Sequence, residues 1–254
     1  MRVLLPASPD VTDLTSLEGL AAAYAYPGLE PGDSWLRANM VSSLDGSAQA
    51  AGLSEGLSSP ADKRIFGVLR ALSDVIVVGA STARAEGYRP ARARKEFAAE
   101  RAARGQGPAP AIALVSARLD LDFADPLFTE PLAPTIVLTI ADAPSEALAE
   151  ARKVADVVIT GEGRVDLARA RAELAARGLV RQLTEGGPTL LGQLVAQDLL
   201  DELCLSLAPL VTAGTATRIA HAAEEVTERL ELVALLEEKG FLFARYARSV
   251  VASD

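Results

Sequence analysis

The sequence predicts an α/β protein with three layers, in which helices cover both faces of a mostly parallel mixed sheet and an antiparallel hairpin closes the sheet at the C-terminus. From Trp35 onward, short apolar runs typical of buried strands alternate with segments of helical periodicity. Half of the residues are hydrophobic but only 4% are aromatic, and alanine is abundant, which suits helices packed over a sheet. Segment 228–251 consists of two apolar runs around Glu238, Lys239 and Gly240, a hairpin pattern.

The first 34 residues are predicted to stand apart from this sheet. Segment 14–25 has the pattern of a short helix. Segment 26–34 follows with the turn signals Pro27-Gly28 and Pro31-Gly32, which are typical of a linker. We therefore expect an N-terminal extension and linker over 1–34, and one main domain over 35–254.

Seven segments before the hairpin have the composition of strands. Most are short, rich in valine, isoleucine and leucine, and continuous rather than alternating, as in a sheet covered on both faces. The predicted strands are 35–43, 74–80, 111–117, 134–140, 155–161, 179–185 and 201–211.

Helical segments separate these strands. Segment 60–73 opens with Pro60 and places apolar side chains at helical spacing. Segment 166–178 has Asp166 as a candidate N-cap and Gly178 just past its end. The other predicted helices are 91–105, 144–153 and the segment that starts at Pro188.

Charge and composition exclude several classes of function. A formal net charge of -9 argues against a nucleic acid or an anionic membrane as the main partner. The only cysteine, Cys204, lies in an apolar strand and reads as a core residue, and the only histidine, His221, as structural or solvent-facing. We expect no metal site, no membrane span and a cytoplasmic protein.

Three predicted strand ends carry candidate site residues, because ligands of such sheets bind at the carboxyl ends of strands. The first strand ends in Asp45-Gly46, and the second in Gly79, where Ser81 and Thr82 begin a helix. The third passes through Thr184-Glu185-Gly186-Gly187 into Pro188. Adjacent glycines let a ligand lie on the backbone, and helix N-termini favour anions. Two such sites predict an extended ligand with a pyrophosphate, such as a dinucleotide, held without the usual glycine fingerprint.

Three ordered motifs resemble the pyrimidine reductase family of riboflavin biosynthesis, whose reductase domain has a dihydrofolate-reductase-like fold. They are NMVSSLDG at 39–46, SSPADKRIFGVLRALSDVIVVGASTARAEGYRP at 58–90, and EGGPTLLGQLVAQDLLDELCLSLAPLV at 185–211. The resemblance runs from about Trp35 to the C-terminus.

The resemblance implies an NADPH-dependent reductase. In that family a hydride passes to C1′ of the sugar of a ribosylaminopyrimidine 5′-phosphate and gives a ribitylamino product. Arg118, just after Ser116, is the expected contact for the 2′-phosphate of NADPH. The predicted cofactor-binding residues are Ser42, Gly79, Thr82, Glu86, Ser116, Arg118, Gly186, Gly187, Pro188, Thr189 and Leu190.

The resemblance also implies the substrate end of the site. Glu185 is expected to face the sugar or the base. Arg70 is expected to grip the sugar phosphate, although a cation there could instead complement the end of its helix. The predicted substrate-binding residues are Ser54, Arg70, Arg89 and Glu185, and the predicted catalytic residues are Asn39, Asp45 and Glu185.

Several departures from the family keep other functions open. The chain has neither H-x-E nor P-C-x-x-C, so no zinc deaminase is predicted. Asn39 stands where many bacterial members have lysine, Gly56 stands where an aromatic residue is common, and the loop around Tyr88 is short. A reductase of the same fold acting on a pterin or dihydrofolate is therefore an alternative, and a non-catalytic nucleotide-binding protein is another. We also predict a homodimer, because the late apolar strands leave a sheet edge that needs cover.

Overall fold

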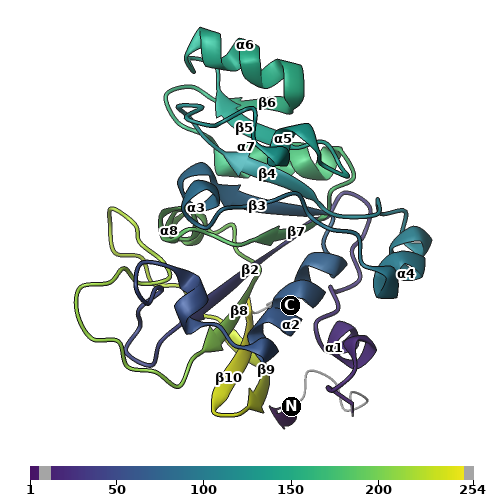
Figure 1. Ribbon diagram of the computed structural model, residues 1–254, viewed down its shortest axis with the longest axis vertical. Helices are drawn as coiled ribbons and strands as arrows, with labels where there is room; N and C mark the ends of the chain where they lie inside the picture. The colour runs from purple at the N-terminus through teal and green to yellow at the C-terminus, as the bar shows by residue number, and fades with distance from the viewer. Residues whose placement is uncertain (6–12, 249–254) are drawn as a thin grey trace, which may run out of the picture. The chain divides into compact units, whose positions relative to one another are not determined.

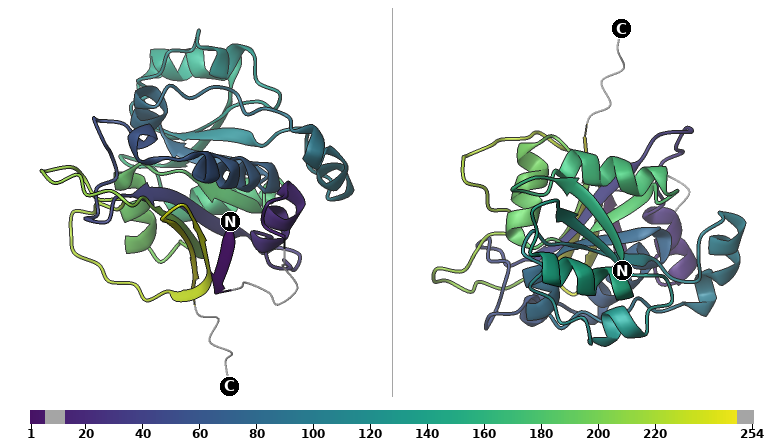
Figure 2. Two further views of the ribbon diagram at one scale, coloured as in Figure 1. Left: turned by 60° about the horizontal axis from the view of Figure 1, so that its bottom comes forward. Right: turned by 90° about the horizontal axis from the view of Figure 1, so that it is seen from above.

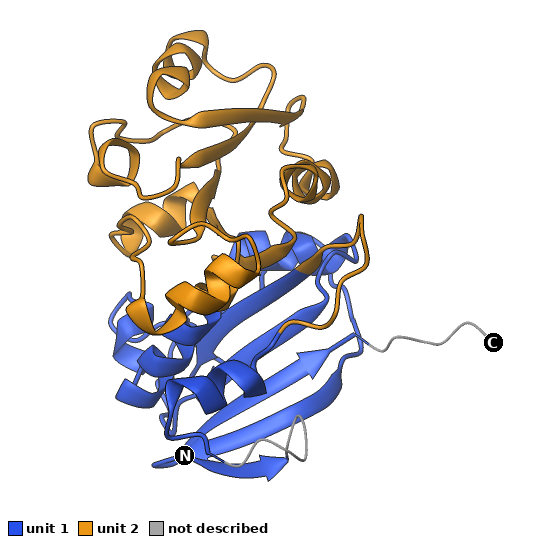
Figure 3. Cartoon of the chain, turned by 90° about the vertical axis from the view of Figure 1, so that its right-hand side faces the viewer, with its two compact units in different colours: residues 1–25, 36–69, 188–254 blue, residues 26–35, 70–187 orange. Residues whose placement is uncertain are grey.

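The computed structural model describes residues 1–5 and 13–248 and divides the chain into two compact units (Figure 3). Unit 1 comprises Met1–Ala25, Leu36–Leu69 and Pro188–Asp254, and unit 2 comprises Tyr26–Trp35 and Arg70–Gly187. Figure 1 labels the elements. The chain leaves unit 1 and returns to it, so each unit is built from segments that are distant in sequence.

Unit 2 contains a parallel sheet with the strand order β7-β3-β4-β5-β6. Its strands are β3 (Val75–Gly79), β4 (Ala111–Val115), β5 (Ile136–Ile140), β6 (Asp156–Gly161) and β7 (Arg181–Thr184). Each neighbouring pair in this order is parallel. The central strands are buried along most of their length, which explains their unbroken apolar runs.

The helices of unit 2 lie on both faces of that sheet. The crossovers from β3 through β4 and β5 to β6 all step in one direction, whereas the crossover from β6 to β7 steps back. Because such crossovers are right-handed, α7 lies on the face opposite α6, as Figure 2 shows. The helical elements are α3 (Ala80–Ala85), η2 (Lys95–Phe97), α4 (Ala98–Ala103), α5 (Pro126–Thr129), α6 (Ser145–Val154) and α7 (Leu167–Ala176).

Two of these helices test the predictions made from sequence. The Asp166 side chain accepts a hydrogen bond from the Arg169 N–H at 2.9 Å, which confirms it as the N-cap of α7. The helix predicted over 91–105 is wrong in length, because only a 3-10 turn and the six-residue α4 form there. Its first residues, Ala-Arg-Ala-Arg, offer no side chain that could cap a helix start.

Unit 1 contains a mixed sheet with the strand order β1-β9-β10-β8-β2. Its strands are β1 (Arg2–Leu5), β2 (Trp35–Ser42), β8 (Glu202–Leu207), β9 (Glu231–Glu238) and β10 (Phe241–Ala247). β2 and β8 are parallel, and β10 pairs antiparallel with β8. β9 and β10 form the antiparallel C-terminal hairpin that the sequence predicted. Cys204 is buried in β8 and His221 is exposed, in agreement with their predicted roles.

Helix α8 (Pro188–Ala196) packs on the strands of unit 1. Its Leu191 forms a buried cluster with Ala38 of β2 and with Leu200. The segment at His221 lies directly against the helix, since a Cβ at Gly192 would be only 2.1 Å from the His221 carbonyl oxygen. The remaining helices that begin in unit 1 are α1 (Leu17–Ala23), η1 (Ser54–Leu57) and α2 (Pro60–Leu72), and the last residues of α2 fall in unit 2.

The N-terminal residues contribute to the sheet of unit 1, contrary to the sequence-based expectation that they stand apart from it. β1 pairs antiparallel with β9, with Arg2 opposite Glu237. The predicted domain start near Trp35 stays a prediction, but the residues before it are not a detached extension. Local sequence could not reveal this pairing, because its partners lie more than two hundred residues apart.

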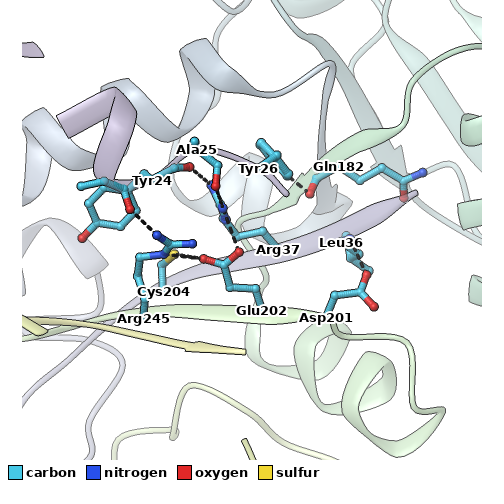
Figure 4. A network of polar contacts seen from close by, with 11 residues as sticks. Tyr24, Ala25, Tyr26, Leu36, Arg37, Gln182, Asp201, Glu202, Cys204 and Arg245 are labelled. Carbon is cyan, nitrogen blue, oxygen red and sulfur yellow. Dashed lines mark hydrogen bonds and ion pairs between the residues drawn. The ribbon is translucent and has the colours of Figure 1, made fainter. Parts of the chain in front are cut away.

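A buried ion network ties α1 to β2, β8 and β10 (Figure 4). Glu202 accepts hydrogen bonds from Arg37 at 2.8 Å and from Arg245 at 2.7 Å. Arg37 also donates to the Tyr24 carbonyl at 2.7 Å, and Arg245 donates to the Ala23 carbonyl. Burial opposes the charge of Glu202, but the two arginines overcome this effect and lower its pKa. The carbonyls at the end of α1 therefore serve as acceptors for the two arginines of this network.

Within the described part of the chain, no helix has the length and apolar character needed to cross a membrane. The same residues contain no group of three or more histidine, cysteine, aspartate or glutamate side chains that could hold a metal ion.

Candidate active site

The carboxyl ends of β3 and β7 bring two of the predicted glycine turns together in unit 2. Val77 of β3 pairs with Thr184 of β7, so both strands end at the same edge. The Gly79 N–H donates to the Gly186 carbonyl at 2.8 Å, and the peptide bond between Gly186 and Gly187 is cis. Gly186 has a φ of 79°, in the region that favours glycine. The backbone at this edge is thus fixed from both strands.

Gly187 is a glycine because a side chain of α3 already occupies the space beside it. A Cβ at position 187 would lie 2.2 Å from Thr82 Oγ1. Thr82 is half-buried and lies in the first turn of α3, directly after Gly79. The group that approaches the second glycine is therefore the Thr82 hydroxyl, which the sequence had placed among the cofactor-binding residues.

The buried Glu185 side chain is held by two half-buried side chains, those of Arg70 and Tyr88. The guanidinium of Arg70 donates from Nε to Oε1 at 2.7 Å and from Nη2 to Oε2 at 2.6 Å. The Tyr88 hydroxyl also donates to Oε2, and the guanidinium carbon lies 5.3 Å from the centre of the Tyr88 ring. Only 3% of the Glu185 side chain is exposed. The result is a two-pronged ion pair with an aromatic side chain against it.

A second arginine, Arg101, binds the end of α2. Arg101 is buried and donates from Nη1 to the carbonyls of Ala71 at 2.7 Å and Ser73 at 2.8 Å. Arg101 is therefore a cation that complements the C-terminus of α2. Arg70 also lies in the last turn of α2, and its guanidinium binds the Glu185 carboxylate at the same time.

The cluster has a definite charge state at neutral pH. Burial opposes the charge of Arg70, but Glu185 and Tyr88 overcome this effect and raise the pKa of Arg70 above its usual value. Burial, together with the negative charge of Glu185, raises the pKa of the Tyr88 phenol well above its usual value. Arg70 is consequently a cation and Tyr88 a neutral donor. The cluster can offer fixed acceptor oxygens to a hydroxylated ligand.

The other cofactor candidates of unit 2 lie along the same edge of its sheet or just after α3. Gly79 is in register with Val115 of β4, so Ser116 follows at the neighbouring strand end. The buried Ser116 hydroxyl accepts a hydrogen bond from the Leu119 N–H at 3.0 Å and closes the turn that carries the exposed Arg118. Glu86 is half-buried at the end of α3. This edge combines glycine backbone, hydroxyls and a guanidinium, a donor set that fits an extended anionic ligand.

Arg89 is not joined to the Arg70–Glu185 cluster. Its side chain is 63% exposed, and its guanidinium lies 3.8 Å from the Asp125 carboxylate, which precedes α5. This position differs from that of Arg70, whose charge is engaged in the buried pair.

The remaining predicted site residues belong to unit 1. Asn39 is half-buried on β2, and Ser42 is buried at the end of that strand. Ser54 is half-buried at the start of η1. At the start of α8 Pro188 is half-buried, Thr189 is exposed and Leu190 is buried, and the Pro188 carbonyl accepts a hydrogen bond from the His221 N–H.

Asp45 ties two loops of unit 1 together. Its carboxylate accepts hydrogen bonds from the Ser43 hydroxyl, from the Thr212 N–H at 3.1 Å and from the Ala213 N–H at 2.8 Å. These bonds lower the pKa of Asp45 to about 2, with the Ser43 bond contributing most. Asp45 is therefore ionised at neutral pH and acts as an acceptor rather than as a source of protons.

Sequence reasoning missed two members of this arrangement. The sequence analysis considered Tyr88 only for the short loop around it, and Arg101 only as part of the predicted helix over 91–105. A tyrosine three residues past the end of a helix carries no local signal of a distant carboxylate. Arg101 and its acceptors Ala71 and Ser73 are likewise about thirty residues apart in sequence.

Comparisons with known proteins agree with this architecture. Residues 34–238 match the RibD C-terminal domain family. The chain is 33% identical over 177 residues to a 2,5-diamino-6-ribosylamino-4(3H)-pyrimidinone 5′-phosphate reductase of Archaeoglobus fulgidus. That alignment covers 69% of this chain and 80% of the archaeal protein. It is 32% identical over 197 residues to the reductase of the same name from Methanothermobacter thermautotrophicus, which covers 78% of this chain and 88% of that protein.

A solved structure has the same fold. The crystal structure of a pyrimidine reductase-like protein from Corynebacterium diphtheriae superposes with a TM-score of 0.80 and 27% identity, over 89% of this chain and 98% of that one. This likeness confirms the fold class predicted from the sequence. The family match covers most of the chain, and both archaeal relatives align over most of their length, so the chain belongs to the RibD C-terminal domain family.

Proposed function

We propose that the protein is an NADPH-dependent reductase of riboflavin biosynthesis that acts on 2,5-diamino-6-ribosylamino-4(3H)-pyrimidinone 5′-phosphate. The observation that carries this proposal is the identity of 33% and 32% to two archaeal reductases of that name over most of their length. In the proposed reaction C1′ of the ribosyl group gains a hydride, the C1′–O4′ bond breaks, and O4′ gains a proton. The ribosylamino group becomes a ribitylamino group.

The edge formed by β3, β4 and β7 supports NADPH as the cofactor. Gly79, Gly186 and Gly187 leave backbone without side chains there, and Thr82 and Ser116 add hydroxyls. Arg118 is exposed just past β4, where a guanidinium can pair with a 2′-phosphate in two-pronged fashion. The resemblance to the family also assigns Glu86, Pro188, Thr189 and Leu190 to the cofactor. When bound, the nicotinamide supplies the hydride.

The buried pair of Glu185 and Arg70 supports a substrate with several hydroxyl groups. A carboxylate has about four acceptor positions, and Arg70 and Tyr88 donate three hydrogen bonds to Glu185. Glu185 is thus oriented before any ligand arrives, and the ribosyl hydroxyls are suitable donors to it. We assign Ser54 and Arg89 to the phosphorylated end of the substrate, with Arg70 beside the sugar.

The two predicted catalytic residues of unit 1 receive different roles. Asn39 can orient the substrate through its amide, which carries both donors and an acceptor. Asp45 holds the loop that contains Thr212 and Ala213 in place, and its low pKa makes it unsuitable as the acid that protonates O4′. Ser42, buried at the end of the same strand, is proposed to contact the cofactor.

Steady-state kinetics test the proposal. Purified protein is given NADPH or NADH with the pyrimidine 5′-phosphate, with dihydrofolate or with a pterin. We expect rapid NADPH oxidation with the pyrimidine alone and a much lower kcat/KM with NADH. Turnover of dihydrofolate instead of the pyrimidine would contradict the proposed substrate. Binding of NADPH without any turnover would support a non-catalytic protein.

A further inference from the structure

Tyr88 contacts both members of the Arg70–Glu185 pair. Its hydroxyl donates to Glu185 Oε2, and its ring lies under the Arg70 guanidinium at 5.3 Å. The side chain comes from the segment after α3, whereas Arg70 comes from the end of α2 and Glu185 follows β7. One aromatic residue therefore fixes a carboxylate and a guanidinium that two other elements supply.

The backbone around Tyr88 holds the ring in that place. Gly87 has a φ of 63° and turns the chain away from α3. The Tyr88 N–H then donates to the Ala83 carbonyl at 2.9 Å, so the residue stays attached to the helix it follows. Thr82, one residue earlier on that helix, lies against Gly187. Segment 82–88 thus contacts the turn after β7 at two places, with Thr82 against Gly187 and Tyr88 bonded to Glu185.

The three hydrogen bonds to Glu185 are divided unequally between its oxygens. Oε2 accepts from Arg70 Nη2 and from Tyr88, and Oε1 accepts only from Arg70 Nε among these bonds. Oε1 consequently retains more acceptor capacity for an incoming hydroxyl. Without the Tyr88 bond the two oxygens would be used equally, and the carboxylate would be held by the Arg70 fork alone.

We propose that Tyr88 is a positioning residue, which holds Glu185 so that Oε1 faces the ribosyl hydroxyls of the substrate. This inference rests on the proposed function. The phenol is suited to the role, because burial and Glu185 raise its pKa and keep it a donor across the working pH range. Tyr88 acts through Glu185 and makes no contact with the reacting atoms.

A double-mutant cycle separates this role from a direct or a merely structural one. Tyr88→Phe and Glu185→Gln are made singly and together, and the substrate dissociation constant is measured by calorimetry in the presence of NADP⁺. We expect Tyr88→Phe to weaken substrate about tenfold in the wild-type background, or about 1.4 kcal/mol, and to have no further effect in Glu185→Gln. NADPH affinity should change by less than about twofold, because Tyr88 is not part of the proposed cofactor edge.

Tyr26→Phe provides a matched control. Its hydroxyl donates to the Gln182 carbonyl at 3.3 Å and also belongs to unit 2. It should lower the melting temperature about as much as Tyr88→Phe does, without weakening substrate. An unchanged substrate affinity in Tyr88→Phe would overturn the proposal, and so would a tenfold loss that persists in Glu185→Gln. A melting temperature that falls far more in Tyr88→Phe than in Tyr26→Phe would also overturn the proposal.

The failure of this inference can be told apart from the failure of the proposed function. The same cycle is measured by urea unfolding, which needs no substrate and should show non-additive effects of Tyr88→Phe and Glu185→Gln. If the wild type does not turn over the pyrimidine but unfolding shows the coupling, the proposed function fails and the positioning contact stands. If the effects on unfolding are additive, the positioning role fails whatever the protein reduces.

Discussion

At the scale of single residues, the pairing of Arg70 with Glu185 changes what a substitution of Arg70 should do. Arg70→Ala would leave the Glu185 carboxylate buried without its cation, which costs about 3 kcal/mol of unfolding free energy or more. Substrate affinity should fall as well. Urea unfolding measures the loss, and Arg84→Ala is the control, because Arg84 and its partner Asp120 are both largely exposed. That control should cost less than about 1 kcal/mol. Equal small losses in both variants would contradict the buried pair.

The Gly187 position yields a second prediction at this scale. Gly187→Ala brings a methyl group against Thr82 Oγ1 and should cost about 1–3 kcal/mol through overpacking. Thr82→Ala in the same protein should restore the melting temperature, since the nearest remaining Thr82 atom, Cβ, lies at 3.5 Å. Gly187→Val should in addition abolish NADPH binding. If Gly187→Val leaves NADPH affinity unchanged in a titration, the glycine pair is only a turn.

Sequence reasoning at this scale selected residues whose signal is local. Glu185 and its glycines stood out because they interrupt the passage from an apolar strand to a helix. Tyr88 and Arg101 escaped notice because their partners lie on other elements, and only the folded chain brings them together. Arg70 was recognised as a candidate for the substrate phosphate, which stays a prediction, but its bidentate contact with the Glu185 carboxylate was not foreseen.

At the scale of elements, the N-terminal segment is predicted to be necessary for stability. Removing residues 1–30 takes away β1 and α1, together with the carbonyls that accept from Arg37 and Arg245. Buried cations without acceptors are costly, by about 3 kcal/mol or more in total. Thermal unfolding should show a large loss. Removal of residues 1–12 is the control, because it deletes β1 but keeps those carbonyls. If removal of 1–30 costs no more than removal of 1–12, the ion network is not what anchors α1.

Some helices and strands could be predicted from sequence patterns and others could not. The strands that follow Trp35 and the C-terminal hairpin were predicted, because apolar runs and turn residues are local signals. β1 was missed, since a strand of four residues before a proline is defined by its pairing with β9 and by nothing in its own sequence. The helix predicted over 91–105 was too long because alanine-rich composition was read without a capping residue.

At the scale of the whole molecule, we predict a homodimer, although one reason for that prediction has changed. The outer edge of the C-terminal hairpin was expected to need cover from a second copy, but β1 already pairs with β9. The exposed apolar side chains Leu4 and Leu5 on β1 now mark the uncovered edge. Light scattering at micromolar concentration should give twice the chain mass of 26.5 kDa. A mass of one chain would contradict this prediction.

The central claim of a hydride transfer to C1′ has one direct test. The protein is incubated with the ribosylaminopyrimidine 5′-phosphate and with NADPH that carries deuterium in the transferable position, and the product is examined by mass spectrometry and NMR. We predict a ribitylamino product that is heavier by one deuterium, with the label on C1′. A product without the label, or the loss of NADPH without any ribitylamino product, would contradict the claim.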